Sequence, residues 1–109
     1  MLGGKGRYSE ATKVAEEALT VAENTFGPDH IRGAPCLNIL ATLYRVQGKY
    51  IEAEALLKGA LKIWEKALGP DHPVVLATLE NMADLYEKIG KQDEAERLKE
   101  RARRIRSNQ

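Results

Sequence analysis

The 109-residue sequence has little of several features that would point to particular classes of protein. Its single cysteine, Cys36, excludes a disulfide within the chain and suits a reducing compartment, so we expect a cytoplasmic protein. No apolar run approaches the roughly 20 residues of a membrane-spanning helix, and the first six residues lack the apolar stretch of a signal peptide. The net charge of +1 gives no general attraction to polyanions.

What the sequence has instead is an internal repeat with a period of 42 residues. Gly-Pro-Asp-His occurs at Gly27–His30 and again at Gly69–His72, and residues 27–67 match residues 69–109 at 16 of 41 positions. The matches are mostly Gly, Ala, Leu and Tyr, which are backbone and packing residues. A repeat of this length predicts a stacked solenoid, in which function belongs to a surface.

Each repeat has the apolar spacing of two helices. Apolar residues follow an i, i+3, i+4, i+7 pattern in two copies: Leu37, Leu40, Ala41, Tyr44 and Leu79, Met82, Ala83, Tyr86. Gly48 and Gly90 can end helices in the left-handed conformation, and Asp71 or His72 can cap the helix that starts at Pro73. Pro35 delays the start of the earlier helix. The predicted helices span roughly 7–25, 34–47, 50–67, 74–89 and 92–106.

These motifs resemble the tetratricopeptide repeat family. The resemblance rests on Leu-x-x-Leu/Met-Ala-x-x-Tyr in one helix, then Gly-Lys, then Glu-Ala, then an alanine about seven residues later. The usual period of that repeat is about 34 residues. The 42-residue period with its Gly-Pro-Asp-His linker looks like the longer-helix variant of kinesin light chains and many bacterial relatives. HEAT and armadillo repeats share the period, but the Ala–Tyr and Gly-Lys…Glu-Ala placements argue against them.

The resemblance implies an all-α fold, a superhelical solenoid of about two and a half repeats with five antiparallel helices. We expect one domain over residues 1–109: the second helix of a truncated repeat at 7–26, a full repeat at 31–68, and a full C-terminal repeat at 73–107. In the last helix, Lys99, Arg103 and Arg106 replace Leu57, Leu61 and Trp64 at positions that would face a following repeat. A stack needs a polar cap where it stops, so we expect the C-terminal fragment of a longer array.

The first predicted helix has no partner helix before it. A strip of five residues should therefore lack part of its cover: Val14, Ala15, Ala18, Leu19 and Ala22. An exposed apolar strip is a contact site or a liability. Two explanations are open, namely truncation from a longer array, or a short protein that forms a homodimer through this strip.

Catalytic, metal and cofactor sites are not indicated. His30 and His72 occupy equivalent loops, where they suit helix caps better than a metal site of three or four ligands. Cys36 has Thr78 as its counterpart, which favours a packing role, and Trp64 lies on a core stripe. The basic C-terminal run lacks interleaved aromatic residues, so we expect no nucleic-acid partner.

The resemblance implies that ligands bind on the concave side, which the first helix of each pair lines. Counted from each Tyr, the expected partner-binding groove contains Asn38, Thr42, Arg45, Ala77, Glu80, Asn81, Asp84 and Glu87. Three acids on the second helix, offset only by Arg45, oppose a bound anion. We therefore expect a basic or neutral protein or peptide as the partner; a solvated face without a ligand is the alternative.

The sequence thus predicts a non-enzymatic protein-interaction scaffold without cofactors, which binds a peptide or a partner domain on its concave face. The alternative is a structural self-assembly element that dimerises through the uncovered N-terminal helix. Membrane association is not expected.

Overall fold

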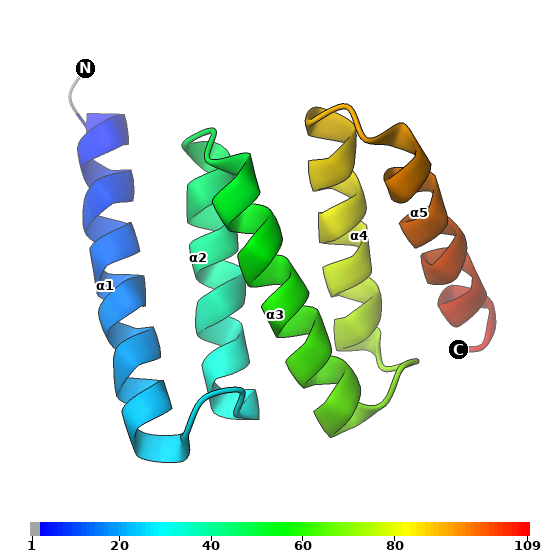
Figure 1. Ribbon diagram of the computed structural model, residues 1–109, viewed down its shortest axis with the longest axis horizontal. Helices are drawn as coiled ribbons and strands as arrows, with labels where there is room; N and C mark the ends of the chain where they lie inside the picture. The colour runs from blue at the N-terminus through cyan, green and yellow to red at the C-terminus, as the bar shows by residue number, and fades with distance from the viewer. Residues whose placement is uncertain (1–2) are drawn as a thin grey trace. The chain divides into compact units, whose positions relative to one another are not determined.

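The computed structural model describes residues 3–109, and this part of the chain holds α-helices, one short 3₁₀ helix and no strand (Figure 1). The elements are α1 (Gly3–Phe26), η1 (Ile31–Gly33), α2 (Ala34–Val46), α3 (Tyr50–Leu68), α4 (Pro73–Lys88) and α5 (Gln92–Ser107). The predicted all-α fold of five helices is confirmed. The apolar pattern did not predict η1, and α1 begins earlier than the predicted residue 7.

The chain divides into two compact units, Met1–Ala60 and Leu61–Gln109, with the boundary inside α3. Unit 1 contains α1, η1, α2 and most of α3. Unit 2 contains the end of α3 together with α4 and α5.

The helix boundaries follow from the loop residues that recur in both repeats. In each Gly-Pro-Asp-His loop the histidine Nδ1 accepts a hydrogen bond from a backbone N–H two residues later, at 3.1 Å: His30 from Arg32 and His72 from Val74. Each histidine therefore satisfies one of the N–H groups that a helix start leaves unpaired. The predicted capping role is confirmed, and His72 rather than Asp71 is the cap of α4.

The turn after α4 shows why glycine ends these helices. Gly90 has φ +85°, a left-handed conformation that strains other residues, and Gly48 in the equivalent turn has φ +81°. In both turns the next residue, Lys49 or Lys91, donates its backbone N–H to the carbonyl of the preceding Tyr at 2.8 Å. The two hairpin turns are thus built alike.

Unit 1 is held together mainly by the packing of α1 on α2 and η1. Thr12 and Ala15 of α1 are buried, as are Ala34, Leu40 and Ala41 of α2. The side-chain amide of Gln47 donates to Thr12 Oγ1 at 3.0 Å. Helix α1 thus uses one side for its contact with α2.

In unit 2, α4 and α5 pack against each other along their length (Figure 1). Val75, Leu79 and Leu85 of α4 are buried almost completely, and Ala95, Ala102 and Ile105 of α5 are buried too. Trp64 is also buried, as the core stripe predicted. The guanidinium of Arg101 pairs with the carboxylate of Glu65, which ties α5 to the end of α3.

The repeat alignment predicts that six residues are largely buried: Tyr44, Ala53, Ala60, Leu61, Tyr86 and Ala95. Ala53, Ala60, Tyr86 and Ala95 are buried, whereas Tyr44 and Leu61 are only half-buried. The phenol of Tyr44 reaches the surface because its hydroxyl donates a hydrogen bond to Glu16 at 2.7 Å.

Candidate functional site

The three groove residues predicted on α2 differ in exposure. Thr42 is exposed, whereas Asn38 and Arg45 are half-buried. The Thr42 hydroxyl donates a hydrogen bond to the backbone carbonyl of Asn38, 3.1 Å away on the same helix. The methyl group of Thr42 is then the part of the side chain that remains for contact with a ligand. Asn38 Oδ1 is buried and, among the described residues, accepts no hydrogen bond. Arg45 is thus the one charged side chain among the three predicted groove residues of α2.

The five groove residues predicted on α4 lie on one side of that helix. Ala77, Glu80, Asn81 and Asp84 are exposed, and Glu87 is half-buried. Glu80 forms an ion pair with Arg106, and Glu87 forms one with Lys99. The ammonium of Lys99 also lies 3.6 Å from the carboxylate of Glu96.

This pairing corrects the expected charge of the α4 face. Only Arg45 was expected to offset the three acids, but side chains from α5 neutralise Glu80 and Glu87. For Asp84, no ion pair is present within the part of the chain that the structure describes. The α4 face is therefore a mixed-charge surface with one unmatched carboxylate.

The ion pairs follow from the antiparallel register of the α4–α5 hairpin. Glu80 and Arg106 each lie thirteen residues from Asp93, and Glu87 and Lys99 each lie six residues from it. In the preceding repeat, the residues equivalent to Glu87 and Lys99 are Arg45 and Leu57, which cannot form such a pair.

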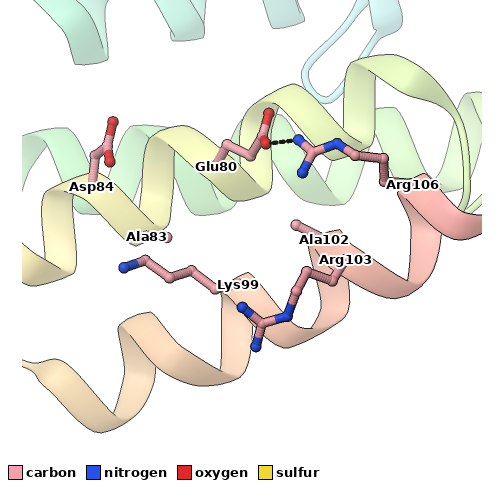
Figure 2. A pocket seen from close by; sticks show the side chains of 7 residues that line it. All are labelled: Glu80, Ala83, Asp84, Lys99, Ala102, Arg103 and Arg106. Atoms are coloured by element: carbon pink, nitrogen blue, oxygen red, sulfur yellow. Dashed lines mark hydrogen bonds and ion pairs between the residues drawn. The ribbon is translucent and has the colours of Figure 1, made fainter.

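A shallow pocket of about 220 Å³ lies between α4 and α5, next to these ion pairs (Figure 2). Small side chains and charged ones line it: Glu80, Ala83, Asp84, Lys99, Ala102, Arg103 and Arg106. Figure 2 shows Glu80 and Arg106 joined across one end, with Asp84 further along α4. The guanidinium of Arg103 pairs with Glu100 on its own helix at 2.9 Å. Hence the three basic residues that line the pocket all have acidic partners.

The pKa values of two α5 side chains, Lys99 and Glu100, are shifted in directions that agree with this pairing. The hydrogen bond to Glu87 raises the pKa of Lys99, with the nearby charges of Glu87 and Glu96 adding to it. The hydrogen bond from Arg103, and then the charges of Arg103 and Arg104, lower the pKa of Glu100. The hydrogen-bonded partner of Glu100 is thus Arg103, three residues later on the same helix.

Two exposed apolar residues on α2 were not among the predicted groove residues. Ile39 and Val46 are 54% and 49% exposed and lie seven residues apart, with Thr42 between them on the same side of the helix. Their equivalents on α4 are Asn81 and Lys88. Since Asn81 was counted as a groove residue, the 42-residue offset alone could have identified Ile39.

The five strip residues predicted on α1 do not share one face. Ala15 is buried, and Leu19 and Ala22 are half-buried beside Gly33, whereas Val14 and Ala18 are exposed. The strip therefore splits into a side that packs on α2 and η1 and a side that faces solvent. Self-association through α1 stays a prediction.

Within residues 3–109, no cluster of three or more His, Cys, Asp or Glu side chains could hold a metal ion. Cys36 is half-buried and free. In the same part of the chain, no helix is both long and apolar enough to cross a membrane.

Comparison with known families gives two matches. A tetratricopeptide repeat model matches residues 34–108, and a second tetratricopeptide repeat model matches residues 1–32. Among curated proteins, none matches the sequence.

Solved structures provide similar folds. The crystal structure of BtubC (BKLC) from P. vanneervenii is 27% identical with a TM-score of 0.89, over 95% of this chain and 41% of that one. A candidate kinesin light chain of Podosopora anserina with nearly identical TPR-like repeats is 28% identical with a TM-score of 0.83, over 94% of this chain and 49% of that one. The chain thus spans less than half the length of these relatives.

Proposed function

Because the chain belongs to the tetratricopeptide repeat family, we propose that it is a non-catalytic scaffold that binds a protein or peptide partner. Repeats of this family generally mediate protein–protein interactions. The observation that supports a binding face on this chain is the exposed apolar pair of α2, Ile39 and Val46.

The α2 face favours a partner with apolar side chains. Ile39 and Val46 are separated by about 10 Å along the helix axis, since each residue adds about 1.5 Å. A polyproline-II segment carries residues i and i+3 on one side, about 9 Å apart. Two apolar side chains with that spacing would cover both residues and remove apolar surface from water.

The α4 face favours a basic or neutral partner. With Glu80 and Glu87 paired to α5, Asp84 is the carboxylate that decides which charge is accepted there. A partner carboxylate beside it would be repelled, whereas a Lys or Arg would be attracted. This surface contact gives selectivity more than affinity, and salt should weaken it.

A peptide-array screen followed by titration of the best peptide tests the proposal. The Ile39→Asp/Val46→Asp variant should weaken binding by about ten-fold or more, because two apolar contacts become charged. Ile51→Asp is the matched control, since Ile51 is 77% exposed on α3 and lies outside the proposed face. Equal loss in both variants, or preferential binding of acidic peptides, would contradict the proposal.

We also propose that the protein is cytoplasmic, as expected from the sequence. Fractionation of cells that produce the natural protein tests it directly. Recovery with secreted or membrane fractions would contradict it.

A further inference from the structure

The pocket between α4 and α5 combines an apolar floor with charged walls. Ala83 and Ala102 form its floor and are only 2% and 3% exposed. Glu80 and Asp84 stand on successive turns of α4 along one edge, and the three basic residues of the lining belong to α5 (Figure 2). Pockets for drug-sized ligands have roughly 300–1,000 Å³, so the pocket volume of about 220 Å³ suits a single side chain.

The preceding repeat shows that this pocket does not suit ordinary packing by an apolar helix. There, the residues equivalent to the three basic ones are Leu57, Leu61 and Trp64. Leu57 and Trp64 are buried, as expected for core positions. A helix that covered α5 in the same way would remove three charged groups from water, which is unfavourable. The occupant must therefore be compatible with charge.

The ion pairs around the pocket decide which charge it accepts. Lys99, Arg103 and Arg106 each have an acidic partner, so an anion would have to compete with the carboxylates that already hold them. Asp84 differs, because it has no ion pair within residues 3–109, not even with the exposed Lys88 one helical turn later. A cation can therefore enter without breaking an existing pair.

Glu80 adds to the attraction for a cation. It lies four residues before Asp84, and carboxylates at this spacing on a helix repel each other. The pair with Arg106 uses Oε2 of Glu80, so Oε1 can still accept a hydrogen bond. A positive group placed between the two acids would thus interact with both and reduce their repulsion.

We propose that this pocket holds a basic side chain, Lys or Arg, of the partner that binds the α4 face. The alkyl stem of that side chain lies on Ala83 and Ala102, and its charged end lies between Asp84 and Glu80. Long basic side chains commonly cover apolar surface with the stem while the charged end stays at the surface. The inference rests on the proposed function and specifies the partner residue that the α4 face selects.

Substitutions in the best-binding peptide of the array test the proposal. At each basic position the peptide is made with lysine, arginine, norleucine or 2,3-diaminopropionic acid. Norleucine keeps the alkyl stem without the charge, and diaminopropionic acid keeps the charge on a short stem. At one position, Lys or Arg should bind about two- to five-fold more tightly than either analogue, as for a surface ion pair with an apolar contact.

The protein variant Asp84→Asn tests the same contact from the other side. It should bind the lysine and norleucine peptides equally, because the unpaired carboxylate is gone. Glu23→Gln is the matched control, since it removes one negative charge from an exposed position on α1 outside the pocket and should keep the preference for lysine. The ¹³C-methyl signals of Ala83 and Ala102 should shift when the lysine peptide is added.

Two results would overturn the pocket as the site of the basic side chain. One is an unchanged preference for lysine in Asp84→Asn, and the other is unshifted methyl signals of Ala83 and Ala102 while the peptide binds. The proposed function would then still stand if Ile39→Asp/Val46→Asp weakens binding. A peptide array without any binder would overturn both proposals, and one whose binders lack Lys and Arg would overturn this one alone.

Discussion

The hydroxyl of Tyr44 donates a hydrogen bond to the carboxylate of Glu16, 2.7 Å away, and thereby joins α2 to α1. In the next repeat the counterpart of Glu16 is Lys58, which cannot accept this bond. The 42-residue repeat therefore does not by itself predict this contact.

Removing this hydroxyl should lower the stability of the first helix pair. Tyr44→Phe loses a hydrogen bond to a charged acceptor at the surface, which corresponds to about 1 kcal/mol of unfolding free energy. Urea unfolding measures this change in the free energy of unfolding. Glu16→Gln is the control, because an amide oxygen still accepts the bond, and it should cost less. A Phe variant as stable as the wild type would contradict the contact.

The titration of Tyr44 should depend on the same contact. The hydrogen bond to Glu16, then burial, then the charges of Glu16 and Glu52 raise the pKa of the Tyr44 phenol above its ordinary value. The folded state thus favours the neutral phenol of Tyr44. The resulting contribution to the free energy of unfolding is complete at pH values below the ordinary tyrosine pKa and is lost as the pH rises through the raised pKa of Tyr44. Ultraviolet titration of phenolate absorbance should show that a transition above the ordinary tyrosine pKa disappears in Tyr44→Phe.

Replacing the capping histidine should destabilise α4. His72→Ala removes the acceptor for the Val74 N–H and should cost about 1 kcal/mol. His72→Asn restores a side-chain acceptor of the kind that caps helices well and should recover most of that loss. Thermal unfolding followed by circular dichroism measures both, and equal melting temperatures for the two variants would argue against capping.

Enlarging a fully buried alanine should disturb the core. Ala60 on α3 is 0% exposed, so Ala60→Leu should overpack its surroundings and cost about 1–3 kcal/mol. Ala67→Leu is a matched control on the same helix, since Ala67 is exposed. Similar melting temperatures for both variants would contradict the close packing at residue 60.

The helices could be predicted because the sequence marks their ends chemically. Gly48 and Gly90 adopt the expected left-handed conformation, and Pro35 delays α2 to Ala34 as expected. The 3₁₀ helix at Ile31–Gly33 was missed, because a single turn has no apolar period to detect. Local signals thus determine the elements but not every short connection.

The candidate site could be predicted only in part, because side-chain pairing depends on how two helices meet. Glu80 and Arg106 are 26 residues apart, and their contact depends on the register set by the turn at Gly90. The α1 strip was predicted as one surface because apolar spacing alone does not reveal which side packs on α2. In the structure Ala15 is buried, whereas its neighbour Val14 is exposed.

The capping bonds of the two histidines also fix where the ring protons lie. Since Nδ1 of His30 and of His72 accepts a backbone N–H, the neutral ring carries its proton on Nε2. Neither nitrogen then has a free lone pair for a metal ion. Metal binding at these loops must therefore break a helix cap, so these residues cannot serve as caps and as ligands at the same time.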